Sequence, residues 1–236
     1  MADYAMKEIQ TRLENHEDFH ANINNAFRDV FLSVDEALKS VQEIEPIFSG
    51  TTACVVLMRD KKLFIANVGD SRAVLGRNVN GSFSSVDLSI DQNPDSPGEM
   101  PRIENCGGFV SPPPEVGLSA RVWLDEDYTQ IGLAMARSIG DHAVKAIGVI
   151  ADPVVTTHNL IESDKFLIIA TDGVWEFISS EEAVLLVSSS FNQGLDASVA
   201  CEQLIEKAAS KWKEIEGDYR DDITAVIVRI NHLCFD

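Results

Sequence analysis

The sequence predicts an α+β fold with a mostly antiparallel sheet, because helical and strand patterns occupy separate stretches of the 236 residues. The first fifty residues show helical periodicity. Short runs rich in β-branched residues follow between 53 and 88, and helical patterns return after residue 180. Strands grouped between helices favour α+β over a regular βαβ alternation. We see no internal repeat or linker, so we expect one domain over residues 1–236.

Two helices are predicted before residue 50. The first covers residues 1–13 and begins abruptly, without a capping residue ahead of it. The second carries an apolar residue at every third or fourth position, namely Ile23, Phe27, Val30, Phe31, Val34, Leu38 and Val41. This spacing places one apolar stripe along the helix, which predicts a buried face.

The middle of the chain predicts strands and then a loop. The runs at 53–58, 63–68, 73–75 and 84–88 are separated by the turn signals Arg59-Asp60, Gly69-Asp70 and Asn80-Gly81. Residues 91–130 hold six of the eight prolines, so we expect mostly loop there. Beyond it, we predict strands at 166–170 and 223–230 and helices at 181–187 and 197–212.

Acidic residues stand next to two of these strands. Asp172 follows the run 166–170, and Glu176 falls on the same side of the chain if a helical turn follows. Asp221 comes just before the last strand. Carboxylates at the ends of neighbouring strands are the ligands that hard ions such as Mg²⁺ or Mn²⁺ prefer. The alternative is that these residues, and Asp70 in its Gly-Asp-Ser turn, only shape ordinary turns.

Charge and cysteine content limit the possible functions. The chain has 38 acidic and 19 basic residues, a net charge of −19, which argues against nucleic-acid binding and against anionic membrane surfaces. There is no apolar leader and no run of transmembrane length. An intracellular location, in the cytoplasm, the nucleus or both, fits four widely spaced cysteines without a C-x-x-C pair, which are Cys54, Cys106, Cys201 and Cys234.

Six segments, in order between residues 50 and 228, resemble the signatures of the metal-dependent PPM-type (type 2C) serine/threonine protein phosphatases. Residues 50–53 resemble G-[ST]-T-A, and 66–75 resemble A-N-x-G-D-S-R-A-V-L. Residues 99–108 match E-x-x-R-I-x-x-x-G-G, and 133–141 are similar to L-A-x-S-R-x-x-G-D. The last two, 171–177 and 220–224, resemble D-G-x-W-[DE] and R-D-[ND]-[IM]-T.

This resemblance implies a central antiparallel β-sandwich flanked by helices in α-β-β-α layers. It implies hydrolysis of phosphoserine and phosphothreonine in phosphoprotein substrates, with two Mg²⁺ or Mn²⁺ ions that acidify a bridging water and neutralise the phosphoryl oxygens. Asp172 and Asp221 would bind one of these ions, and Asp70, Asp172 and Glu176 would form a weaker third site. Asp141 would support the metals, and loop 109–128 would shape substrate preference.

One part of the family pattern is missing from the sequence. Family members carry R-x-x-[ML]-E-D and F-[AG]-V-[FY]-D-G-H-G-G ahead of G-[ST]-T-A, and residues 1–14 resemble the helix that follows the second motif. We therefore expect an N-terminally truncated domain with weak or no activity, and with sheet edges left open to association.

Two functions remain open for such a chain. It is either a fragment of an active phosphatase or a pseudophosphatase that binds phosphoproteins or regulatory partners without turnover. Intact Asp70, Asp172 and Asp221 favour the first, because carboxylates that no cation neutralises repel one another. The sequence does not determine the oligomeric state.

Overall fold

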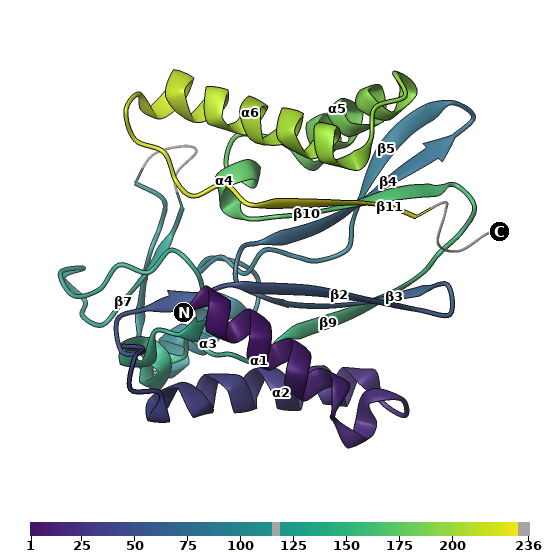
Figure 1. Cartoon of the computed structure of the whole chain (residues 1–236). Coiled ribbons are helices and arrows are strands. Elements are labelled where there is room, and N and C mark those ends of the chain that lie inside the picture. Colours follow the sequence, from purple (N-terminus) through teal and green to yellow (C-terminus); the bar gives the residue numbers. More distant parts are fainter. Residues whose placement is uncertain (115–118, 231–236) are drawn as a thin grey trace. The chain divides into compact units, whose positions relative to one another are not determined.

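The structure, a computed structural model, describes residues 1–114 and 119–230 and consists of two compact units (Figure 1). The first contains Met1–Val55, Ala66–Asp70 and Asp91–Val155. The second contains Val56–Ile65, Ser71–Ile90 and the described residues from Thr156 onward. Both combine helices with antiparallel strand pairs, so the predicted α+β class is confirmed. None of the helices in the described part of the chain is long and apolar enough to span a membrane.

The first unit begins with the two predicted helices, α1 (Ala2–Glu14) and α2 (Ile23–Ala37), which pack together. As expected, α1 starts without a side-chain cap. Helix α2 is capped by Asn22, whose side chain accepts a hydrogen bond from the Asn25 N–H at 3.3 Å. The predicted apolar stripe of α2 is buried up to Leu38, where the short 3₁₀ turn η2 (Leu38–Ser40) ends the helical segment.

The described part of residues 91–130 is mostly loop, as expected, but it also contains a helix and a hairpin that the sequence did not predict. Helix α3 (Glu99–Asn105) forms there, with Pro101 in its first turn, where a missing N–H costs little. A hairpin of β6 (Phe109–Ser111) and β7 (Arg121–Trp123) also forms. Both pack on a small core that contains Ile103, Val122, Ala136, Val144 and Val149. Residues 115–118 of the predicted substrate loop lie outside the described residues.

The other strands that contribute residues to the first unit either are short or also contribute residues to the second unit. Strand β1 (Gly50–Thr51) pairs with β8 (Ile139–Gly140), and a 3₁₀ helix, η3 (His142–Ile147), follows β8. Strands β2 (Ala53–Arg59), β3 (Lys62–Val68) and β9 (Val154–Asn159) form a three-stranded sheet. The sequence patterns predicted β2 and β3 but missed β9, which is only partly buried along its length.

The second unit contains a four-stranded antiparallel sheet in the order β11-β10-β4-β5. Its strands are β4 (Arg72–Val79), β5 (Ser82–Asp87), β10 (Asp164–Ala170) and β11 (Ala225–Arg229). Strand β4 is longer than the predicted 73–75, and its hairpin with β5 turns at Asn80 and Gly81, which both have positive φ as a type I′ turn requires.

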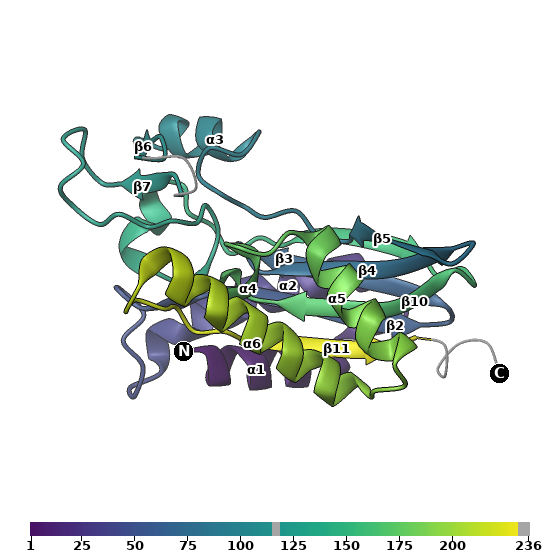
Figure 2. The same cartoon turned by 90° about the horizontal axis from the view of Figure 1, so that it is seen from above.

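Helices α5 (Ser180–Asn192) and α6 (Ala197–Glu216) lie on one face of that sheet, and the short α4 (Asp172–Trp175) follows β10 directly (Figures 1 and 2). The core between helices and sheet includes Phe166, Ile168, Val184, Leu204 and Ala208. Because this core fixes the ends of β10 and β11 against α4 and α6, it also positions the acidic residues at that edge.

Candidate functional site

Asp172 and Glu176 are arranged by a single helical turn. The Glu176 N–H donates to the Asp172 carbonyl oxygen at 2.8 Å, so the predicted turn forms directly after β10. The Trp175 ring is buried beneath the turn, and its Nε1–H donates to the Ala170 carbonyl oxygen at 2.7 Å. Residues four apart on a helical turn lie on the same side, so both carboxylates belong to one face of α4.

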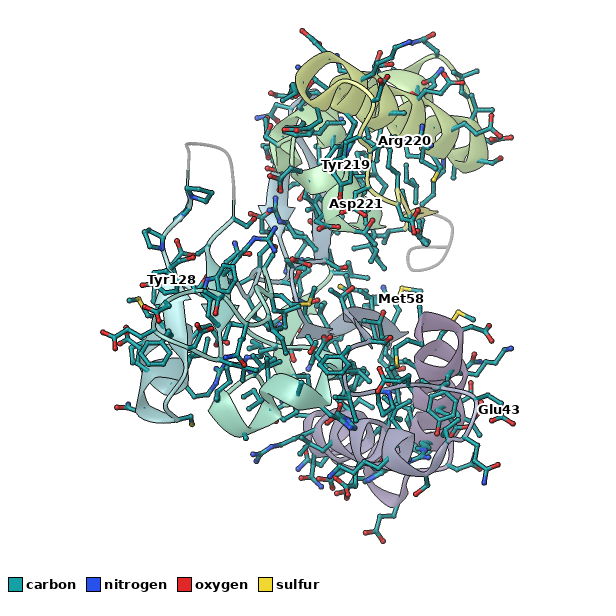
Figure 3. All side chains as sticks on the ribbon, turned by 90° about the vertical axis from the view of Figure 1, so that its left-hand side faces the viewer. Glu43, Met58, Tyr128, Tyr219, Arg220 and Asp221 are labelled. Atoms are coloured by element: carbon teal, nitrogen blue, oxygen red, sulfur yellow. The ribbon has the colours of Figure 1, made fainter. Side chains whose placement is uncertain are left out.

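Asp221 reaches the same edge from the segment between α6 and β11, next to Tyr219 and Arg220 (Figure 3). Ala170 of β10 pairs with Ala225 of β11, so Asp172 and Asp221 lie beyond the same end of two neighbouring strands. The backbone therefore places Asp172 and Asp221 at the ends of adjacent strands, as the sequence predicted. The Asp222 N–H donates to Asp221 Oδ1 at 2.7 Å and orients that carboxylate.

Close backbone packing holds this segment against α4. Gly173 explains how: a Cβ at this position would lie 2.3 Å from the Asp222 carbonyl oxygen, so only glycine allows the approach. The Thr171 N–H donates to the Thr224 carbonyl oxygen at 3.1 Å, and the Thr224 N–H donates to Thr171 Oγ1 at 3.2 Å. One backbone hydrogen bond, one hydrogen bond to the Thr171 hydroxyl and one steric requirement thus hold the Asp221 segment beside Asp172.

The electrostatics of Glu176 show that negative charge accumulates at this edge. Burial raises the pKa of the Glu176 carboxyl, and the carboxylates of Asp172, Glu216 and Asp221 raise it further. Glu216, at the end of α6, was not predicted from the sequence. A cation at this edge would offset the negative charges that raise the pKa of Glu176, and carboxylate oxygens suit a hard divalent ion. The chemistry of these groups therefore fits the predicted metal.

As placed, however, no three side chains of His, Cys, Asp or Glu among residues 1–114 and 119–230 come close enough to hold one ion. The carboxylates of Asp172, Asp221 and Glu176 supply the oxygen ligands that such an ion prefers, but they do not form a complete coordination shell. That Asp172, Asp221 and Glu176 bind metal therefore stays a prediction.

Asp70 belongs to the first unit, whereas the other three predicted ligands belong to the second. It follows a turn that Gln92 fixes: Gln92 Oε1 accepts from the Gly69 N–H at 2.7 Å, and Gln92 Nε2 donates to the Asn67 carbonyl oxygen at 2.9 Å. Gly69 has φ of +102°, where glycine is favoured. The turn is well defined, and the role of Asp70 in a third metal site stays a prediction.

Asp141, the predicted supporting residue, is held in the left-handed region with φ of 52°, an uncommon conformation for aspartate. Its N–H donates to the Ser49 carbonyl oxygen at 2.8 Å. A Cβ at Gly50 would lie 1.8 Å from Asp141 Oδ2, so glycine leaves room for this carboxylate. Burial raises the pKa of Asp141; the nearby Ser138 hydroxyl, which does not reach hydrogen-bond geometry, and the Lys145 ammonium lower it in part.

Asp35 is the member of this cluster that the sequence analysis missed. Its Oδ1 accepts from the Gly140 N–H at 2.7 Å and lies 3.3 Å from His142 Nε2 and 3.5 Å from Lys145 Nζ. Burial also lowers the pKa of the Lys145 ammonium, which donates to the Ser138 carbonyl oxygen. The sequence feature that could have identified Asp35 is its position directly beside the apolar stripe of α2, where an acidic residue needs a polar partner.

The family-like element around α3 proves to be an ion-pair network. The buried Glu99 accepts from Arg102 Nη1 at 2.7 Å and from Arg137 Nη2 at 2.6 Å. Although burial raises the pKa of Glu99, the two arginines hold it below its ordinary value. Arg102 also donates to the Gly148 and Ala136 carbonyl oxygens, both at 2.8 Å. These arginines join three chain segments and so serve the fold.

Comparison with known proteins places the chain in a family. The model of the protein phosphatase 2C family matches residues 1–214, so the chain belongs to this family. It is similar to "Probable protein phosphatase 2C 75" of Oryza sativa subsp. japonica, with 36% identity over 220 residues, covering 92% of this chain and 50% of that protein. "Probable protein phosphatase 2C 64" of the same organism is 40% identical over 207 residues, covering 86% and 47%. The chain thus spans about half the length of these curated relatives.

Solved structures agree at the level of the fold. The serine-threonine phosphatase 2C from Toxoplasma gondii superposes with a TM-score of 0.83 over 97% of this chain and 80% of that chain, at 19% sequence identity. A C. elegans sex determining protein gives a TM-score of 0.74 over 98% of this chain and 52% of that chain, at 22% identity. Likeness at such identity shows a common fold, and the chemistry must be argued from the residues.

Proposed function

We propose that residues 1–236 act as one phosphatase domain of the protein phosphatase 2C type, which hydrolyses phosphoserine and phosphothreonine in intracellular phosphoproteins of the cytoplasm, the nucleus or both. The observation that carries this proposal is the group of carboxylates at the end of β10 and β11. Asp172 and Asp221 lie beyond adjacent strand ends, and their charges raise the pKa of Glu176. An acidic group of this kind is suited to a divalent cation.

In this proposal Asp172 and Asp221 bind Mg²⁺ or Mn²⁺, with Glu176 available for a weaker additional site. When bound, such ions neutralise the phosphoryl oxygens and lower the pKa of water. The chain's other residues hold the ligands in place. Trp212 Nε1 donates to the Gly173 carbonyl oxygen at 2.7 Å and so ties α6 to α4. Thr171 and Gly173 keep the Asp221 segment against the same turn.

We expect the chain alone to turn over phosphoesters weakly. The 236 residues do not contain the D-G-H-G-G motif that supplies a bridging carboxylate in the family it resembles. Asp172 and Asp221 then remain as the two carboxylates for a core ion, which leaves most of the coordination positions to water.

A second candidate function is a pseudophosphatase that binds phosphoproteins without hydrolysing them. One observation favours it: within the described part of the chain, no three His, Cys, Asp or Glu side chains are close enough to one another to hold one metal ion. Against it stands the clustering of Asp172, Asp221 and Glu216 around Glu176, which costs stability unless a cation compensates the repulsion.

The test is to measure Mn²⁺ binding by calorimetry and p-nitrophenyl phosphate hydrolysis on the same preparations. We compare the chain with Asp172→Asn, Asp221→Asn and, as a control, Asp87→Asn on the exposed end of β5. The first two should weaken Mn²⁺ binding by more than about tenfold, since even the partners of metal ligands typically contribute that much. The control should not change it.

The outcomes separate the two candidates. Hydrolysis that requires Mn²⁺ and Asp172 supports a phosphatase. Mn²⁺ binding without hydrolysis would show that the chain binds the metal but does not hydrolyse phosphoesters by itself. If Mn²⁺ does not bind, or binds equally to Asp172→Asn, the proposed metal site is wrong.

A further inference from the structure

The second unit contains a cavity of about 250 Å³ that the proposed phosphatase chemistry does not use. It lies between the end of α5 and the beginning of β10, with residues from β4, β5 and β11 completing its wall. Strand β10 separates it from the carboxylate group: Lys165 is at one end of the strand and Asp172 follows the other. At about 3.3 Å per residue, they are about 20 Å apart.

Two cationic side chains form part of the wall. Lys165 is the extra residue of a β-bulge between Asp164 and Phe166, and bulges redirect side chains out of the regular strand alternation. Its Nζ donates to the Glu162 carbonyl oxygen at 2.7 Å, a neutral acceptor. Arg229 donates from Nη2 to the Leu195 carbonyl oxygen, also neutral.

These charges face the cavity without an acidic neighbour in its wall. The lining residues that the structure describes include neither aspartate nor glutamate, in a chain with twice as many acidic as basic residues. Arg229 Nε is buried, and within the described residues it has no hydrogen-bond partner. Asp196 does not line the cavity: its carboxylate caps α6 by accepting from the Val199 N–H at 3.0 Å. This hydrogen bond and the Ser198 hydroxyl lower the pKa of Asp196, and the Arg229 guanidinium lowers it further. An anion inside the cavity would therefore meet two cationic side chains and no carboxylate among the described lining residues.

Aromatic rings form the apolar part of the wall. Phe166 packs edge-on against Phe191, with ring centroids 5.3 Å apart, and Phe83 lies 5.9 Å from Phe166. The Arg229 guanidinium lies 3.9 Å above the Phe191 ring, which holds it at the edge of the aromatic surface. Gly76 makes this arrangement possible, because a Cβ there would lie 2.2 Å from Phe166 Cζ.

We propose that this cavity binds a small organic anion that joins a carboxylate to one aromatic ring. Lys165 and Arg229 would bind the carboxylate, and the phenylalanine rings would pack on the ring. The Asn78 side chain adds a donor, since its Oδ1 already accepts from the Gly81 N–H at 2.9 Å and its amide hydrogens remain for a ligand. The volume is below the roughly 300–1,000 Å³ of drug-sized sites, which limits the ligand to about one ring.

The test is an NMR titration of the ¹⁵N-labelled, metal-free chain with benzoate, which has both features. Benzamide keeps the ring without the charge, and acetate keeps the charge without the ring. We expect saturable binding of benzoate that shifts the amide signals of Phe191 and Asn192, with weaker binding of both controls. Lys165→Gln and Arg229→Gln should each weaken it by about tenfold or more, since hydrogen bonds to charged groups contribute about 1.5–3 kcal/mol.

Two control variants make the result specific. Lys207→Gln removes an exposed α6 cation that pairs with Glu182 and does not line the cavity, so affinity should not change. Asp172→Asn should bind benzoate normally, which separates this site from the proposed metal site. If Arg229→Gln fails to fold because Leu195 loses its donor, Lys165→Gln alone decides. The proposal is overturned if benzoate does not saturate, if benzamide binds equally well, or if Lys165→Gln leaves the affinity unchanged.

Discussion

Asp164 is a fully buried carboxylate at the start of β10, and its partners account for its burial. Its Oδ1 accepts from Arg77 Nε at 2.8 Å, and its Oδ2 lies 2.8 Å from His158 Nε2 and accepts from the Ile161 N–H at 3.1 Å. Burial raises the pKa of Asp164, but these contacts outweigh it and hold the pKa below its ordinary value. The ionised form therefore stabilises the fold.

We predict that Asp164→Asn lowers the free energy of unfolding at pH 7 by about 3 kcal/mol, because Arg77 loses a buried anionic partner. Since the folded pKa is depressed, this contribution is present above the unfolded value of about 3.9 and is lost as the pH falls through the folded pKa. Urea unfolding at pH 7 and at stepwise lower pH should show the difference from wild type narrowing below about pH 4. A difference that is constant over this range would contradict the assignment.

Gly173 is the second residue whose local chemistry makes a sharp prediction. Gly173→Ala places a Cβ 2.3 Å from the Asp222 carbonyl oxygen, so the segment that carries Asp221 must move. We expect weaker Mn²⁺ binding together with a loss of stability of about 1–3 kcal/mol, as other overpacked positions show. Calorimetry and urea unfolding measure the two effects.

The control for this substitution is Gly81→Ala in the β4–β5 turn. A Cβ there contacts no atom within 4 Å in the described structure, although φ is +87°. It should cost stability through backbone strain alone and leave Mn²⁺ binding unchanged. Equal Mn²⁺ affinity for Gly173→Ala and wild type would show that the Asp221 segment does not need this close approach.

At the scale of elements, helix α5 depends on a defined N-terminus. The Ser179 Oγ accepts from the Glu182 N–H at 3.1 Å, with Glu181 and Glu182 in the first turn. Acidic residues there interact favourably with the helix dipole. The Glu181 carboxylate also accepts from the Ser85 N–H at 2.9 Å, which ties the start of α5 to β5.

We predict that Ser179→Ala lowers stability by about 1 kcal/mol, the usual contribution of a serine cap. Ser189→Ala, at an exposed position of the same helix, is the matched control and should be neutral or slightly stabilising because alanine has the higher helix propensity. Thermal and urea unfolding of both variants test this. Equal stability of the two would mean that packing on the sheet, and not the cap, defines the start of α5.

At the scale of the whole molecule, the net charge of −19 is the dominant property. Self-repulsion of this size destabilises compact states and is screened by salt. We predict that the melting temperature rises between about 10 and 200 mM NaCl, where the screening length falls to below about 10 Å. Asp172→Asn should show the same salt dependence, because screening acts on all charges. A melting temperature independent of NaCl would show that local ion pairs compensate the charge.

The sequence determined the features that depend on neighbouring residues. Helical spacing identified α1, α2, α5 and α6, and β-branched runs between turn signals identified β2 to β5, β10 and β11. The sequence predicted that Asp172 and Glu176 lie on the same side of the chain, because this arrangement needs only one helical turn. Ordered motifs identified the phosphatase 2C family, which the family model confirms over residues 1–214.

The tertiary structure decided the features that join residues distant in sequence. Asp35 reaches Gly140 across more than a hundred positions, and Glu216 comes to Glu176 because α6 packs beside α4. Helix α3 was missed because Pro101 and the prolines around the helix suggest a loop, whereas burial of Ile103 stabilises the helix. The cavity beside Arg229 arises only when the end of α5 brings Phe191 against Phe166 of β10. Local patterns carry the backbone's short-range preferences, but burial, charge clusters and cavities depend on which elements the fold brings together.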